Sequence, residues 1–118
     1  MANPFVHVEL MTGDVDKAKA FYGALFDWSM EDVPGMDYTI VKVGEGTGGG
    51  MMACPGPDVS PQWLPYVHVK DIAETLDKAR ALGATVMKEV TEVPGMGWFG
   101  ILVDPGGPAF ALWQPNKM

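Results

Sequence analysis

Polar and apolar residues alternate in two short segments of the chain, as they do in strands that bury one face. Residues 5–10 read FVHVEL, and residues 66–70 read YVHVK. Alternation with a period of two predicts a strand in each place. Asp14 and Asp71 follow these strands where a helix N-cap is expected, and apolar residues then recur at helical spacing. Each strand is therefore predicted to lead into a helix.

The pattern occurs twice because the chain contains an internal repeat. The tetrapeptide VPGM at residues 33–36 recurs 60 residues later, and Pro55 recurs at the same offset. A shared offset for two separate markers indicates duplication of a structural unit. The sequence therefore predicts one domain that covers the whole chain, residues 1–118, and consists of two modules, residues 3–55 and 63–115.

Three more strands are predicted after each helix from the same periodicity. They cover residues 27–30, 38–43 and 49–53 in the first module, and residues 85–90, 98–103 and 109–114 in the second. The fold class is therefore α+β, with two βαβββ modules. We expect them to form a curved mixed sheet around a cavity, with the helices on the outer face.

Composition narrows the classes of partner. The 118 residues carry a formal net charge of −7, which disfavours binding to nucleic acid or to an anionic membrane and leaves open the attraction of a cationic ligand. Cys54 is the single cysteine, so the chain has no internal disulfide. We expect neither a signal peptide nor a membrane-spanning run of about 20 apolar residues. The expected location is the cytoplasm.

Several short motifs are similar to those of a known family, and they follow one another along the chain in the family's order. They are Gly13-Asp14-Val15, Ala20-Phe21-Tyr22, Leu25-Phe26-Asp27-Trp28, Ala81-Leu82-Gly83-Ala84 and Val103-Asp104-Pro105-Gly106-Gly107. Over nearly its whole length the chain resembles the glyoxalase/bleomycin resistance protein/dioxygenase superfamily, also called the vicinal oxygen chelate superfamily. The resemblance implies a fold rather than one reaction.

In metal-dependent members of that superfamily, the cavity holds one divalent ion on four strand residues. The resemblance places these positions at His7, Met51, Leu64 and Ala111. Leucine and alanine offer no donor, and a methionine thioether is too soft for such sites. Because catalytic ions usually need three protein ligands, we expect no metal and no other cofactor.

Strand alternation also predicts which side chains line the cavity. The candidate ligand-binding residues are His7, Glu9, Met51, Tyr66, His68 and Trp113. Residues in the opposite phase, such as Leu10 and Leu112, are predicted to pack under the helices. The polar candidates could instead satisfy one another or face water, and a buried Glu9 would need a partner: a histidine, a ligand or water.

Three classes of function agree with these features. The favoured class is a metal-free protein that binds an unidentified small molecule. The alternative is an enzyme, either a metal-dependent lyase, isomerase or dioxygenase similar to lactoylglutathione lyase, or a metal-free catalyst built on His7, Glu9 and His68. The third class is an accessory or regulatory domain. We also expect a homodimer, because an exposed strand edge favours pairing with a second chain.

Overall fold

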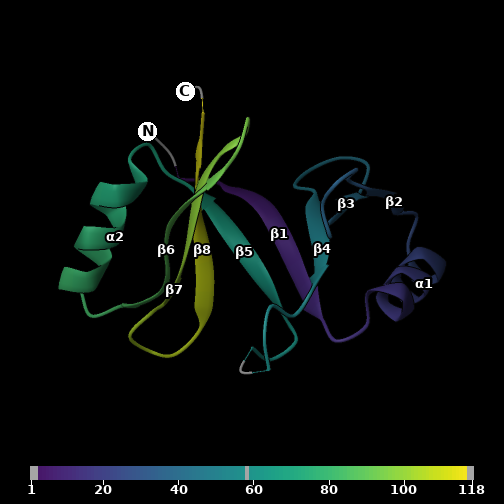
Figure 1. Ribbon diagram of the computed structural model, residues 1–118, viewed down its shortest axis with the longest axis horizontal. Coiled ribbons are helices and arrows are strands. Elements are labelled where there is room, and N and C mark those ends of the chain that lie inside the picture. Colours follow the sequence, from purple (N-terminus) through teal and green to yellow (C-terminus); the bar gives the residue numbers. More distant parts are fainter. Residues whose placement is uncertain (1–2, 58, 117–118) are drawn as a thin grey trace. The chain divides into compact units, whose positions relative to one another are not determined.

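The computed structural model describes residues 3–57 and 59–116, and within them the chain forms two helices and eight strands (Figure 1). The elements are β1 (Phe5–Thr12), α1 (Val15–Leu25), β2 (Ser29–Asp32), β3 (Thr39–Lys42), β4 (Gly49–Ala53), β5 (Gln62–His68), α2 (Ile72–Ala81), β6 (Thr85–Val93), β7 (Gly97–Val103) and β8 (Ala109–Pro115). The predicted α+β class and the repeated βαβββ order are confirmed. Neither helix in the described ranges is long and apolar enough to cross a membrane.

The described chain divides into two compact units. We call residues 7–64 the N-terminal module, and residues 65–116 together with residues 3–6 the C-terminal module. The short segment 3–6 belongs to the second unit because it bonds to the end of β5. The backbone N–H of His68 donates to the carbonyl of Pro4, and the side chain of Asn3 donates to the carbonyl of His68, both at 2.9 Å.

The N-terminal module is a four-stranded mixed sheet with the strand order β2-β3-β4-β1. Helix α1 begins after Asp14, whose carboxylate accepts the backbone N–H of Lys17 at 3.1 Å. One sheet face forms a core with this helix. The buried residues of that core are Leu10, Ala18, Val41 and Met51. We call the opposite sheet face, which points away from the module's helix, the far face.

The C-terminal module repeats this construction with the strand order β5-β8-β7-β6. Asp71 caps α2 by accepting the backbone N–H of Glu74 at 3.1 Å, and Gly83, with a φ of +101°, follows the helix. The core between α2 and the sheet consists of Val69, Ile72, Leu76, Leu102 and Leu112. Its far face again points away from the helix.

Candidate functional site

The most polar part of the N-terminal module's sheet lies on its far face. His7 and Glu9 lie on this face because they alternate along β1 with Leu10, which is in the core. Strands β1 and β4 are parallel, with Glu9 opposite Gly50 and Leu10 opposite Met51. The far face therefore carries an imidazole and a carboxylate next to a glycine.

The phenol of Tyr38 joins these two ionisable side chains. Its oxygen lies 2.6 Å from Nε2 of His7, and its hydroxyl donates to Oε1 of Glu9 at 3.0 Å. The Glu9 side chain is buried, with 6% of its surface exposed. A buried carboxylate is costly unless it is hydrogen-bonded, and the phenol supplies such a bond. We call this group the His7–Tyr38–Glu9 network.

Gly50 makes room for the phenol. A Cβ atom at position 50 would lie 1.8 Å from the Tyr38 hydroxyl oxygen, and 2.2 Å from the ring carbon that bears it. Any other residue would therefore force the ring to move. The glycine is needed here because the side chain of Tyr38, which directly precedes β3, crosses over its backbone.

Tyr38 is positioned by the chain on either side of it. The neighbouring Thr39 begins β3, is buried, and donates its hydroxyl to Asp32 at 2.8 Å. Lys19 of α1 donates to the same carboxylate at 2.8 Å, and this bond, followed by that from Thr39, lowers the pKa of Asp32. On the other side, the backbone N–H of Val33 donates to the carbonyl of Tyr38 at 2.9 Å. The helix and the turn thus fix the start of β3.

Burial favours the neutral form of the histidine in the network. Desolvation lowers the pKa of His7 below its usual value, because a charged imidazole loses hydration inside the protein. Tyr38 donates its only proton to Glu9, so its oxygen must accept the shorter hydrogen bond from His7. The network therefore requires the Nε2–H tautomer of His7.

The far face of the C-terminal module carries the other predicted residues. Tyr66 lies opposite Ala111, and His68 lies opposite Trp113 in the parallel pairing of β5 with β8. Phe99 of β7 also lies opposite Trp113, and its ring centroid is 6.5 Å from that of Tyr66. This face is thus mainly aromatic, and its core-facing neighbour Leu112 packs under α2.

One of the six predicted site residues, Met51, lies on the other side of its sheet. It is fully buried in the core with Leu10, so it lies on the sheet face opposite to His7 and not beside His7 as predicted. The strand registers explain the error. The residue equivalent to Ala111 is Gly50, an offset of 61 rather than 60. Because side chains alternate, a one-residue shift moves a residue to the opposite face.

The same one-residue difference in offset shows which residue of the second copy is equivalent to Tyr38. Tyr38 was not among the predicted site residues. Pairing of β3 with β4 places Thr39 opposite Met51, and pairing of β7 with β8 places Gly100 opposite Leu112. Tyr38 therefore corresponds to Phe99, again at an offset of 61. The sequence could have indicated this site, because both copies carry an aromatic residue at this position. The match appears only when one extra residue is counted after the second VPGM turn.

These side chains do not fit the divalent ion that the superfamily resemblance implies. With the corrected register, the four positions are His7, Gly50, Leu64 and Ala111, and only the histidine carries a donor. Glu9 carries a second donor group on the same face, but Tyr38 bridges it to His7. Within residues 3–57 and 59–116, no cluster of three His, Cys, Asp or Glu side chains could hold a metal. Three protein ligands are the usual minimum for a catalytic ion.

Comparisons with known proteins agree with this fold. Residues 4–44 match the family model described as bleomycin resistance protein-like N-terminal. The chain is 39% identical over 110 residues to the glyoxylase-named protein CFP32 of Mycobacterium bovis and to that of Mycobacterium tuberculosis. That alignment covers 91% of this chain but 42% of the relatives, so the chain spans about two fifths of their length.

Solved structures of low identity share the fold. Hypothetical protein BH1468 from Bacillus halodurans has a TM-score of 0.70 at 15% identity, over 100% of this chain and 98% of that one. Methylmalonyl-CoA epimerase from Mycobacterium tuberculosis has a TM-score of 0.67 at 17% identity, over 96% and 88%. Two βαβββ modules of this kind define the glyoxalase-like fold class. The family model and the 39% identical relatives indicate the glyoxalase/bleomycin resistance protein/dioxygenase superfamily.

Proposed function

We propose that the protein binds a small organic molecule, without a metal ion, on the far face that carries the His7–Tyr38–Glu9 network. The buried Glu9 carboxylate is the observation that carries this proposal. The C-terminal module fills the equivalent positions with Tyr66 and Phe99, so packing alone does not require a carboxylate there. A polar group retained at a desolvation cost supports a role in recognising a ligand.

Charge narrows the class of ligand. Residues 7–64 contain nine acidic and three basic residues, a net charge of −6, whereas the rest of the chain has six acidic and five basic residues, a net charge of −1. Such a field attracts cations and repels polyanions. We therefore propose an uncharged or cationic ligand. The family description, bleomycin resistance protein-like, agrees with this class.

The alternative function is a metal-dependent lyase, isomerase or dioxygenase. The name of CFP32 and the epimerase titles among the solved neighbours support it. The donor set of His7, Gly50, Leu64 and Ala111 argues against it. Tyr66, His68 and Trp113 form a second candidate binding surface. Their convergence with His7 and Glu9 on one cavity stays a prediction, as does the homodimer.

Titration of EDTA-treated protein tests the proposal. Copper-free bleomycin is the cationic probe and methylmalonyl-CoA the polyanionic one, and amide NMR spectra report where each binds. We expect saturable shifts of the amide signals of β1, β3 and β4 with bleomycin, and none with methylmalonyl-CoA. Tyr38→Phe should weaken binding about tenfold, the effect of losing roughly 1.4 kcal/mol in hydrogen bonds.

Tyr22→Phe removes the same hydroxyl from another part of the module and is the matched control. The bleomycin affinity measured from the amide signals of β1, β3 and β4 should equal that of the unmodified protein. Binding that begins only after a divalent ion is added, together with metal-dependent turnover of the hemithioacetal substrate of lactoylglutathione lyase, would establish the enzymatic alternative instead.

A further inference from the structure

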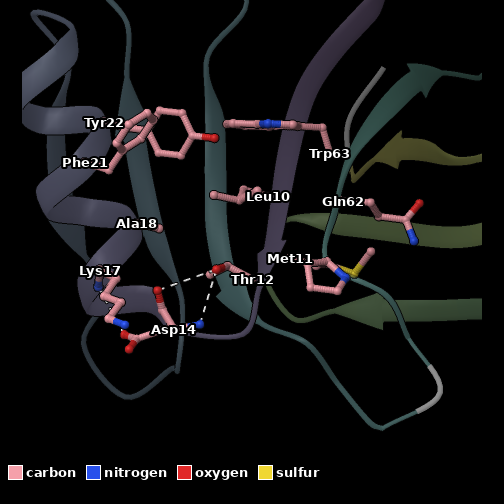
Figure 2. A pocket seen from close by; sticks show the side chains of 11 residues that line it. Leu10, Met11, Thr12, Asp14, Lys17, Ala18, Phe21, Tyr22, Gln62 and Trp63 are labelled. Carbon is pink, nitrogen blue, oxygen red and sulfur yellow. Dashed lines mark hydrogen bonds between the residues drawn. The ribbon is translucent and has the colours of Figure 1, made fainter.

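A further candidate binding site lies on the helix side of the N-terminal module. Figure 2 shows the side chains that line a groove between α1 and the start of β5. The groove has a volume of about 460 Å³. Phe21 and Tyr22 form one wall, Trp63 and Gln62 form the other, and Leu10 lies between them. The volume falls within the range of about 300–1,000 Å³ that is common for small-molecule sites.

The aromatic rings of the groove form a fixed corner. The Tyr22 and Trp63 rings meet edge to face, with centroids 5.4 Å apart and planes at 77°. Trp28 stacks on Tyr22 at 5.7 Å and meets Trp63 at 82°, so it supports both rings. Phe21 adds a third ring, edge-on to Tyr22 at 4.9 Å. Two ring planes near a right angle can contact one compact ligand on two sides.

This corner is unusually exposed for aromatic residues. Phe21 is 59% exposed and Trp63 is 39% exposed. Exposed aromatic residues gathered on one surface are typical of a place where something binds. The ring faces carry partial negative charge and attract cations, with tryptophan the strongest of the three ring types.

The net charge of the module indicates which class of ligand the groove can bind. The module around it has a net charge of −6, which disfavours an anionic ligand and also disfavours a second copy of this acidic chain. Among the groove residues, Asp14 and Lys17 contribute one charge of each sign at the end near the start of α1. The aromatic end of the groove therefore lies in a negative electrostatic field. Among the described residues that line the groove, the positive charge is at the opposite end, on Lys17.

We propose that this groove binds a compact organic cation, such as a quaternary ammonium group, against Trp63, Tyr22 and Phe21. The site is distinct from the His7–Tyr38–Glu9 network, because Leu10 belongs to the core face of β1 and the network belongs to the far face. Binding here does not depend on the function proposed for the network.

The test compares choline with 3,3-dimethylbutan-1-ol, which has the same shape and no charge. Titrations at low ionic strength are followed through the Trp63 indole N–H and the amides of α1. Choline should produce saturable shifts there, and the alcohol should bind roughly threefold to thirtyfold more weakly, the range expected for a cation–π contribution. Equal affinity for the two probes, or no saturable shift with choline, would overturn the proposal.

Two matched pairs of variants sharpen the test. Phe21→Ala should weaken choline binding, whereas Leu25→Ala should not, although the two side chains lie on the same helix and are 59% and 57% exposed. Lys17→Gln should strengthen choline binding more than Lys42→Gln, which removes the same charge from β3. Equal effects within either pair would contradict a site in this groove.

Two controls separate choline binding in this groove from binding at the network and from self-association of the chain. Tyr38→Phe should leave the choline-dependent shifts of the Trp63 and α1 signals unchanged, so failure of the network proposal and failure of the groove proposal give different results. Shifts of the groove signals that depend on protein concentration, without choline, would show that a second copy covers the groove and would overturn the cation assignment.

Discussion

The far faces of the two modules place different chemistry on corresponding positions. Glu9 and Tyr38 of the N-terminal module form a hydrogen bond at 3.0 Å. Their equivalents, Tyr66 and Phe99, form an aromatic contact with ring centroids 6.5 Å apart. The same backbone frame thus holds either a polar or an aromatic pair. Function in this superfamily fold is therefore to be argued from the far-face side chains rather than from the strands that carry them.

The helix-covered faces differ much less. Met51 and Leu112 occupy equivalent positions and are both buried, with 0% and 3% of their surfaces exposed. Each packs with residues of its own helix, Ala18 or Leu76. The two copies have therefore kept the same kind of core and changed the opposite face.

The largest expected effect comes from a charge placed in either core. Met51→Asp and Leu112→Asp should each lower the free energy of unfolding by about 3–5 kcal/mol, because the new carboxylate has no partner there. Urea denaturation measures both changes. Trp113→Ala, on the half-buried far face, should cost about 1–2 kcal/mol. If Met51→Asp were tolerated, the assignment of Met51 to the core would be wrong.

The next effect concerns the residue that makes room for Tyr38. Gly50→Ala should lower stability by about 1–3 kcal/mol, since the added Cβ would meet the phenol at 1.8 Å. The equivalent Ala111 already carries a Cβ, and Ala111→Gly should cost about 1 kcal/mol through added backbone freedom. Calorimetry compares the two. A neutral Gly50→Ala change would mean that Tyr38 does not lie over position 50.

A smaller effect is expected when one position of the N-terminal module is made identical to its equivalent in the C-terminal module. Tyr38→Phe reproduces the phenylalanine found at position 99 and deprives His7 and Glu9 of their shared hydroxyl. The expected loss is about 1–2 kcal/mol in chemical denaturation. Tyr22→Phe should stay within about 0.5 kcal/mol of the unmodified protein. Equal losses in the two variants would indicate that the network contributes nothing specific.

The smallest effect is a dependence of stability on pH. Since the pKa of His7 is lower in the folded state than in the unfolded state, the unfolded chain binds a proton first as the pH falls below about 6.5. Stability should therefore fall with pH below that value, by no more than about 1.4 kcal/mol per pH unit. His7→Gln should flatten this part of the profile. An unchanged slope in this variant would assign it to other groups.

Much of the fold was predictable because its signals are local. Asp14 and Asp71 cap their helices as the sequence indicated, and alternation along β1 separates Glu9 from Leu10. Strand ends were less accurate. Strand β5 covers residues 62–68 rather than 66–70, although the backbone N–H of Val69 still donates to the carbonyl of Trp113 at 2.9 Å.

The candidate site was predictable only in part because its contacts are long-range. Tyr38 is 31 residues from His7 and 29 from Glu9, and no local period encodes such a pairing. A buried Glu9 was predicted to need a partner, namely a histidine, a ligand or water. The partner in the structure is instead the phenol of Tyr38. One extra residue in the second copy then moved the prediction from Gly50 to Met51.

The central claim is that the Tyr38 hydroxyl, rather than a metal ion, is the partner of Nε2 in His7. Long-range ¹H–¹⁵N spectra of the histidine side chains, recorded with EDTA and then with one equivalent of Zn²⁺, test it most directly. We expect an Nε2–H tautomer for His7 and the same pattern in both samples. A Zn²⁺-dependent change of the Nε2 signal to that of a metal-bound nitrogen, with one ion held per chain, would contradict it.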